Sequence, residues 1–316
     1  MRVAILDDYQ DVTRELADWS AVEEDVEVEV FIDHLTDEDE IAQRLKDFEA
    51  ILIMRERTPF RRSQLEKLPN LKLLITSGMR NASVDVAAAN EQGVVVCGTA
   101  GFGGPTADLA WALILSLVRH IPEEDRRVRE GGWQRTIGIG LQGKTLGVAG
   151  LGKLGSRAAA IGKAFGMEVI AWSQNLTAER CAEHGVELVT KPELMRRADV
   201  LTIHLVLSDR TRGLFGAADL ALMKPTSYVI NTARGPIIDE DALVDVLKRG
   251  AIAGAGLDVF SIEPLPADHP FRTLENTVIT PHLGYVEEDN YRAYFKDYVA
   301  DIRGFLDGKP VNVLKG

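Results

Sequence analysis

The segment that decides the fold is Thr145-Leu146-Gly147-Val148-Ala149-Gly150-Leu151-Gly152-Lys153-Leu154-Gly155. A largely apolar run leads into a glycine-rich turn, and residues 156–165 continue with helical periodicity. In such a Gly-x-Gly-x-x-Gly turn, the first glycine permits the tight bend, the second lets a pyrophosphate approach the backbone, and the third lets helix and strand pack closely. The unpaired N–H groups at the start of the helix attract phosphate. We therefore predict a dinucleotide site formed by Gly150, Gly152, Lys153, Leu154 and Gly155.

Short apolar runs alternate with longer amphipathic segments on both sides of this turn, which is typical of parallel sheets covered by helices. Nearly continuous Val, Ile and Leu runs indicate strands that are buried on both faces. We predict an α/β fold with two doubly wound, Rossmann-like parallel-sheet domains and a cleft between them. The expected strands are residues 3–6, 26–32, 50–54, 71–76 and 94–97 in the first domain, and 145–149, 168–172, 186–189, 200–205, 227–231, 254–259 and 278–280 in the second.

The length of 316 residues suggests two domains, at about 150 residues each. Glycines cluster near residue 100, and Pro105 is expected in the first turn of a helix. A long helical pattern at 291–306 follows the last strand and is expected to return to the first domain. We assign residues 1–100 plus 286–316 to a flavodoxin-like substrate-binding domain, and 101–285 to a dinucleotide-binding Rossmann domain. The glycines at the junction are Gly98, Gly101, Gly103 and Gly104.

Composition narrows the classes of partner. A formal net charge of −12 argues against a non-specific nucleic-acid binder, and it means that an anionic substrate needs a local positive group. Cys97 and Cys181 lack metal-ligand spacing, and no His-rich or Asp-rich motif indicates a metal. The early acidic residues are unlike a signal peptide, and the longest apolar stretch, 109–118, is shorter than the roughly 20 residues that span a bilayer. We expect a cytoplasmic protein with no metal, nucleic-acid or membrane partner.

Three chemically useful side chains follow predicted strands in the second half of the chain. Arg234 follows the strand at 227–231, Glu263 the strand at 254–259, and His282 the strand at 278–280. In an open α/β sheet, ligands bind beyond the carboxyl ends of the strands. A guanidinium can hold a substrate carboxylate bidentately, and a carboxylate paired with an imidazole fixes its tautomer and favours its protonated form. Reduction of a 2-keto acid needs such a proton on the carbonyl oxygen. Spacing alone does not establish that Glu263 and His282 meet.

The choice of nicotinamide cofactor stays open. A carboxylate about 20 residues beyond the glycine turn normally binds the adenosine ribose of NAD. Here the strand at 168–172 ends in Ser173-Gln174-Asn175, and Glu168 stands at its other end. Ser173 would not repel a 2′-phosphate, but no neighbouring Arg or Lys clamps one, since Arg180 lies further along the chain. We therefore expect NAD(H) or NADP(H), with Ser173 near the ribose.

Several motifs in this order make the chain resemble the D-isomer-specific 2-hydroxyacid dehydrogenases, which include glyoxylate/hydroxypyruvate reductases, phosphoglycerate dehydrogenases and D-lactate dehydrogenases. The resemblance covers nearly the whole chain. It implies an NAD(P)-dependent enzyme that interconverts a small 2-keto acid and a D-2-hydroxy acid, with Arg234, Glu263 and His282 as the catalytic set. The motifs are residues 147–155, 229–235 with 239–243, 256–260 with Glu263-Pro264, and 280–284.

The resemblance also implies residues around the substrate and the nicotinamide. Asp258 would contact the carboxamide, Thr106 would line the nicotinamide end, and Thr232 is expected among the cofactor contacts. The backbone N–H groups of Ser77, Gly78 and Met79 would receive the substrate carboxylate. Family members are generally dimers, so a homodimer through the segment 105–140 is expected.

Three interpretations stay open. The charged segment 54–58 is unusual for the family, so Arg55 or Arg57 is either a ligand for a second anionic group or a solvated loop charge. A phosphite-type dehydrogenase on the same scaffold is an alternative activity, whereas Glu263 beside His282 disfavours a formate dehydrogenase. A cofactor-sensing, corepressor-like binding protein is the alternative outside enzymes.

Overall fold

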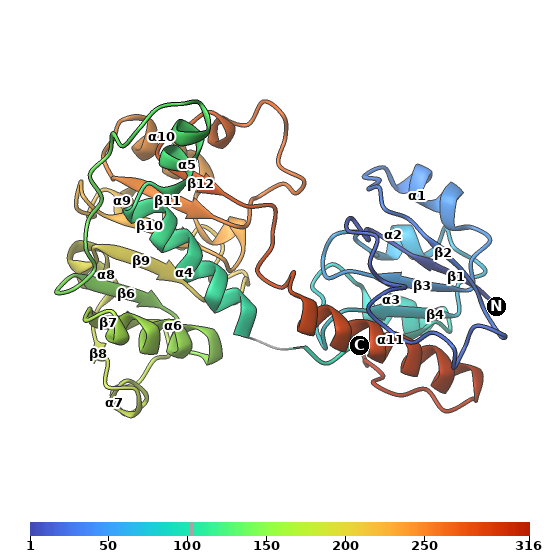
Figure 1. Cartoon of the computed structure of the whole chain (residues 1–316). Helices are drawn as coiled ribbons and strands as arrows, with labels where there is room; N and C mark the ends of the chain where they lie inside the picture. The colour runs from blue at the N-terminus through green and yellow to red at the C-terminus, as the bar shows by residue number, and fades with distance from the viewer. Residues whose placement is uncertain (102–103) are drawn as a thin grey trace. The chain divides into compact units, whose positions relative to one another are not determined.

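The computed structural model describes residues 1–101 and 104–316 (Figure 1). The chain divides into two compact units: unit 1 is Met1–Phe102 with Glu287–Gly316, and unit 2 is Gly103–Val286. Gly103, one of the glycines expected at the junction, lies outside the described residues. The fold class predicted from the sequence is confirmed, because each unit is built on a parallel sheet flanked by helices.

Unit 1 contains a five-stranded parallel sheet with the order β2-β1-β3-β4-β5. The direction of winding reverses between β1 and β3, as in flavodoxin-like sheets. The central strands β3 and β4 are buried along their whole length, as their uninterrupted apolar sequences predict. The strands are β1 (Arg2–Ile5), β2 (Glu27–Val30), β3 (Ala50–Ile53), β4 (Leu73–Thr76) and β5 (Val95–Gly98), and the helices are α1 (Glu38–Leu45), α2 (Arg62–Leu65), α3 (Val86–Glu91) and α11 (Glu288–Leu306).

Helix α11 packs on this sheet although it follows unit 2 in the sequence (Figure 1). Glu287 caps its start by accepting hydrogen bonds from the N–H groups of Asp289 and Asn290. The Tyr298 hydroxyl is fully buried and donates a hydrogen bond of 2.9 Å to the Ile53 carbonyl at the end of β3. The last helix is therefore part of the core of unit 1.

Unit 2 contains a seven-stranded parallel sheet with the order β12-β11-β10-β9-β6-β7-β8. Winding starts at β6 in the interior and proceeds to both edges, which is the doubly wound arrangement. The strands are β6 (Thr145–Ala149), β7 (Glu168–Trp172), β8 (Glu187–Leu188), β9 (Val200–Ile203), β10 (Tyr228–Asn231), β11 (Gly254–Leu257) and β12 (Thr277–Ile279). The helices are α4 (Gly104–Val118), α5 (Ile121–Arg129), α6 (Lys153–Ala164), α7 (Ala178–Glu183), α8 (Lys191–Arg197), α9 (Ala217–Leu220) and α10 (Glu240–Lys248), with short 3-10 turns at Gly235–Ile237 and Pro270–Arg272.

Two apolar cores lie on the two faces of this sheet. Successive strand residues point to opposite faces, so Val229 joins one core and Ile230 the other. Figure 1 shows α4 and α6 on one face, and their apolar residues form the core that contains Ile230. Burial on both faces leaves the ends of the strands as the places where polar side chains can gather.

Candidate active site

The glycine turn between β6 and α6 has the geometry that a pyrophosphate requires. Gly150 has φ +97°, and a Cβ there would lie 2.8 Å from the His204 carbonyl oxygen. A Cβ on residue 155 would lie 1.9 Å from the Gly150 carbonyl oxygen. The first turn of α6 can therefore lie this close to the backbone of Gly150 only because residue 155 is a glycine. Gly152 begins α6 without a side-chain cap, and nothing lies within 4 Å of its Cβ position. The open N-terminus of α6, which starts with Lys153, therefore fits a phosphate ligand.

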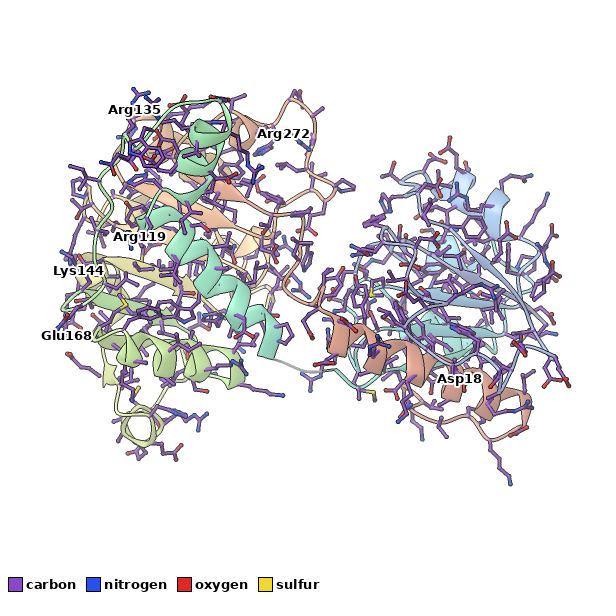
Figure 2. All side chains as sticks on the ribbon, in the orientation of Figure 1. Asp18, Arg119, Arg135, Lys144, Glu168 and Arg272 are labelled. Atoms are coloured by element: carbon purple, nitrogen blue, oxygen red, sulfur yellow. The ribbon has the colours of Figure 1, made fainter. Side chains whose placement is uncertain are left out.

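The end of β7 carries no acid. Gly150 N–H donates to the Trp172 carbonyl at 2.9 Å, which places the glycine turn beside the Ser173 segment. Glu168 starts β7 at the other end, where Figure 2 shows it close to Lys144. Arg180 is bonded to Glu183 at 2.7 Å rather than directed at this segment. The side chains around Ser173 thus offer neutral hydrogen-bonding groups.

Thr232 and His204 are two polar residues near the same end of the sheet. Thr232 is 5% exposed, and its Oγ1 has no hydrogen-bond partner within the described residues, so it can bond a ligand. His204 Nε2 lies 3.0 Å from Thr202 Oγ1, and burial lowers the pKa of His204 to about 4. His204 is therefore neutral at pH 7, and its backbone carbonyl packs against Gly150 in the glycine turn.

Arg234 leaves β10 through a turn that Asn231 holds. Asn231 Oδ1 accepts a hydrogen bond from Ala233 N–H at 3.0 Å, and its Nδ2 donates to the Arg234 carbonyl at 3.0 Å. The next residue, Gly235, packs so closely on Phe260 that a Cβ would lie 2.1 Å from its carbonyl carbon. The turn of Arg234 and the segment leading to Glu263 are therefore in direct contact. The sequence did not predict that Asn231 holds this turn. The available signal was a polar amide at the end of an apolar strand.

His282 and Glu263 meet. His282 Nδ1 lies 2.6 Å from Glu263 Oε2, and Glu263 Oε1 accepts a hydrogen bond from Phe260 N–H at 2.8 Å. A carboxylate only accepts, so the imidazole carries a proton on Nδ1, and Nε2 is left to exchange a proton with another molecule. Such an arrangement can support general acid–base chemistry.

Asp258 holds the loop that carries His282. Its side chain is fully buried, and Oδ1 accepts hydrogen bonds from Thr280 Oγ1 at 2.6 Å and Leu283 N–H at 2.7 Å. Oδ2 accepts from Gly284 N–H at 2.8 Å, and the Gly284 carbonyl accepts from Thr106 Oγ1 at 2.7 Å. Burial raises the pKa of Asp258. Thr106 and Asp258 thus adjoin the His282 loop from α4 and β11.

In unit 1, the three residues expected to receive a carboxylate follow β4. Ser77 N–H donates to the Ile53 carbonyl at 3.1 Å, and Gly78 N–H donates to Thr99 Oγ1 at 2.9 Å. Both groups are therefore engaged within the unit. Of the three backbone N–H groups, only that of Met79 makes no hydrogen bond within the described residues.

Arg55 and Arg57 are bonded to unit 1 rather than extended into solvent. Arg55 has φ +51°, and its Nη1 donates to the Ser77 carbonyl at 3.0 Å while lying directly over Gly78. The Arg57 guanidinium donates to the Asp7 carbonyl and to the Tyr291 hydroxyl. Arg55 therefore adjoins the expected substrate loop.

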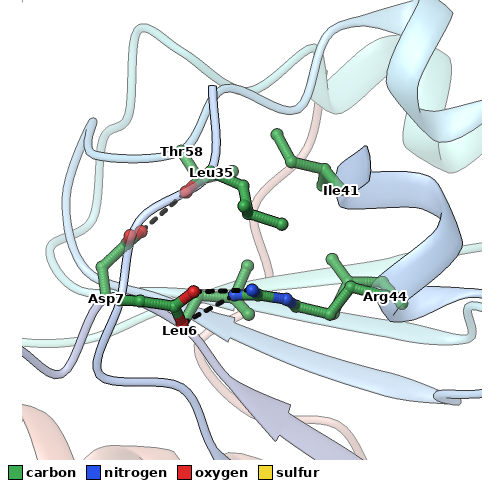
Figure 3. A pocket seen from close by; sticks show the side chains of 8 residues that line it. Leu6, Asp7, Leu35, Ile41, Arg44 and Thr58 are labelled. Carbon is green, nitrogen blue, oxygen red and sulfur yellow. Dashed lines mark hydrogen bonds and ion pairs between the residues drawn. The ribbon is translucent and has the colours of Figure 1, made fainter. Parts of the chain in front are cut away.

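The polar side chains that line a pocket beside β1 and α1 are engaged in hydrogen bonds or ion pairs (Figure 3). Asp7 accepts a hydrogen bond of 2.6 Å from Thr58 and lies 2.8 Å from His34, while Arg44 is paired with Asp33 at 2.6 Å.

Across the described ranges, no group of three or more His, Cys, Asp or Glu side chains is arranged to hold a metal. No described helix combines the length and apolar character needed to cross a membrane.

Residues 111–284 match the family model of the D-isomer specific 2-hydroxyacid dehydrogenase NAD binding domain. The chain belongs to this family. This dehydrogenase is 42% identical to the glyoxylate reductase of Aeropyrum pernix, over 79% of its own length and 78% of that protein. It is 39% identical to the D-3-phosphoglycerate dehydrogenase of Methanocaldococcus jannaschii over 86% of its length, but it spans only 52% of that relative.

The comparison of structures agrees. A phosphoglycerate oxidoreductase from Vibrio cholerae superposes with a TM-score of 0.93 at 38% identity, covering 98% of this dehydrogenase and 99% of that chain. The family places the enzyme among the nicotinamide-dependent dehydrogenases that act on the hydroxyl group of 2-hydroxy acids. The family predicted from the sequence motifs is thus confirmed.

Proposed function

We propose that the enzyme interconverts a small 2-keto acid and the corresponding D-2-hydroxy acid, with His282 and Glu263 as the proton-donating pair and Arg234 as the carboxylate anchor. The observation that carries the proposal is the 2.6 Å contact between His282 Nδ1 and Glu263 Oε2. The turn of Arg234 packs against the segment that leads to Glu263, which supports a shared role.

In the proposed reduction, Arg234 binds the substrate carboxylate bidentately. Glu263 stabilises the imidazolium form of His282, whose Nε2 gives its proton to the carbonyl oxygen. When bound, a reduced nicotinamide supplies the hydride that reaches C2. In the reverse direction, neutral His282 takes the hydroxyl proton at Nε2, and Glu263 stabilises the charge that forms.

We propose that Gly150, Gly152, Lys153, Leu154 and Gly155 bind the cofactor pyrophosphate at the start of α6. Ser173 would lie near the adenosine ribose, and Thr106, Thr232 and Asp258 near the nicotinamide. The partnerless Thr232 hydroxyl supports this assignment. Because the end of β7 carries neither an acid nor an adjacent Arg or Lys, we propose NAD(H) or NADP(H) as the cofactor, with no preference between them set by this segment.

For unit 1 we propose a substrate-binding role that centres on Ser77, Gly78 and Met79. Its supports are the open Met79 N–H and the Arg55 guanidinium beside the loop, which would attract an anion. A cytoplasmic location remains a prediction.

We also propose a homodimer through α5 and the segment that follows it. Helix α5 has no buried residue, and the segment carries Trp133 and Ile137, which are 72% and 92% exposed. Exposed apolar side chains of this size are typical of surfaces that another chain covers. Ile121 and Val128 extend this apolar surface along α5.

A spectrophotometric screen tests the proposed activity. Glyoxylate, hydroxypyruvate, pyruvate and bulkier 2-keto acids are each offered with NADH and with NADPH, and phosphite is offered with the oxidised cofactors. We expect turnover with at least one small 2-keto acid. Phosphite oxidation without keto-acid reduction would favour the phosphite-type alternative, and cofactor binding without any turnover would favour the corepressor-like one.

A further inference from the structure

The loop that carries Glu263 has little support of its own. Ser261, Glu263 and Pro264 are exposed, and the side chain of Ile262 is 65% exposed. Glu263 bonds Phe260 N–H within the same turn, so the shape of this turn decides where its carboxylate lies. Something outside the loop must therefore fix the turn.

Glu240 supplies that support. Its Oε2 accepts a hydrogen bond from Ser261 N–H at 3.0 Å, across 21 residues of sequence. Glu240 is the first residue of α10, where the helix dipole favours a negative charge. The adjacent Asp239 already caps the helix by accepting from Ala242 N–H at 3.1 Å. The carboxylate of Glu240 is thus not needed as a cap and remains available to the loop.

His269 holds the other oxygen of Glu240. Phe271 N–H donates to His269 Nδ1 at 3.2 Å, so in the neutral ring the proton resides on Nε2. This Nε2 lies 3.4 Å from Glu240 Oε1, and both side chains are largely shielded from solvent. The His269 ring also packs on Phe271, whose ring lies 6.2 Å from that of Phe260. The pair therefore adjoins the same turn that presents Glu263.

We propose that Glu240, oriented by His269, is a positioning residue that holds the Phe260–Glu263 turn and thereby keeps Glu263 in register with His282. The inference rests on the proposed role of His282 and Glu263. A displacement of about 1 Å at a catalytic group can cost on the order of 100-fold in rate. The hydrogen bond of 3.0 Å to Ser261 resists such a displacement without touching the substrate.

The test compares three substitutions of Glu240. Glu240→Gln keeps an oxygen acceptor for Ser261 N–H, Glu240→Asp keeps the charge but shortens the reach, and Glu240→Ala removes both. Asp245→Ala is the matched control, since Asp245 lies on the same helix and its side chain is paired with Arg249 at the surface. The measurements are kcat and the KM values for keto acid and cofactor in keto-acid reduction.

We expect Glu240→Ala and Glu240→Asp to lower kcat at least about 10-fold while the KM for the cofactor stays within about 2-fold. Glu240→Gln should retain most of kcat, and Asp245→Ala should match the wild type.

An unchanged kcat in Glu240→Asp would overturn the inference, and so would a loss of kcat in Glu240→Gln as large as that in Glu240→Ala. If Glu240→Ala does not fold, the Gln and Asp variants decide alone. His282→Ala distinguishes a failure of this inference from a failure of the proposed function. Full turnover in that variant would contradict the proposed function itself. Loss of turnover there, with wild-type behaviour in the Glu240 variants, defeats only the role of Glu240.

Discussion

Gly235 lies against the backbone of Phe260, and a Cβ on residue 235 would come within 2.1 Å of the Phe260 carbonyl carbon. This approach joins the turn after β10, which presents Arg234, to the segment after β11, which leads to Glu263. A backbone contact therefore links the turn of Arg234 with the segment leading to Glu263, two residues proposed to act on one substrate. A side chain at position 235 would require the backbone of one of these segments to move.

Gly235→Ala should destabilise unit 2 by about 1–3 kcal/mol, the usual range for overpacking a filled site. It should also lower kcat/KM for the keto acid more than cofactor affinity, because the Arg234 turn must move. Thermal unfolding and steady-state kinetics measure both effects. Gly216→Ala is the control, since the nearest atom to its Cβ position is 3.9 Å away. Equal behaviour of the two variants would contradict the packing argument.

Ser173→Asp should turn the enzyme toward NADH. A carboxylate after β7 can bond the two ribose hydroxyls of NAD and repels a 2′-phosphate, so the KM for NADPH should rise on the order of 10-fold relative to that for NADH. Glu168→Gln, at the opposite end of the same strand, should leave the ratio unchanged. An unaltered ratio in Ser173→Asp would place the ribose elsewhere.

Arg55→Ala should raise the KM for the keto acid on the order of 10-fold, because the guanidinium bonded to the Ser77 carbonyl supports the loop that would hold the carboxylate. The KM for the cofactor should not change. Arg62→Ala is the control, as Arg62 is a half-exposed cation paired with Glu91 on the same unit. A rise confined to substrates with a second anionic group would assign Arg55 to that group instead.

Asp301 should make the stability of unit 1 depend on pH. Burial raises its pKa to about 7, well above that of an exposed carboxyl group. The folded state therefore holds this proton more tightly than the unfolded state, and the contribution to stability is lost as the pH rises from about 4 through 7. Asp301→Asn keeps an oxygen for Asn312 Nδ2, which donates to Asp301 Oδ1 at 2.9 Å.

The Asn variant should be more stable than the wild type by about 2 kcal/mol at pH 8, and this gain should shrink toward pH 4. Urea unfolding at several pH values measures it. A gain that is the same at pH 5 and pH 8 would mean that Asp301 is not protonated in the folded protein near neutrality.

The sequence predicted the strands and the glycine turn well, because buried parallel strands and a phosphate-binding turn leave local patterns. Helix α5 was not predicted, since most of its residues are charged and it buries none of them. The expected strand at 186–189 reduces to Glu187–Leu188, both exposed, at the edge of the sheet.

The sequence indicated the candidate site residues but not the contacts between them. Glu263 and His282 lie on loops after different strands, and only folding shows that they meet at 2.6 Å. Glu240 gave no signal, because an acid in the first turn of a helix is ordinary. The engagement of Ser77 and Gly78 N–H groups within unit 1 depends on Ile53 and Thr99, which are distant in sequence.

The turnover of His282→Ala with the best keto acid from the screen tests the central claim most directly. Loss of the proton donor should lower kcat by about 100-fold to 10,000-fold, the range of general acid catalysis, while cofactor binding measured by fluorescence stays intact. Turnover at the wild-type rate in this variant would contradict the account.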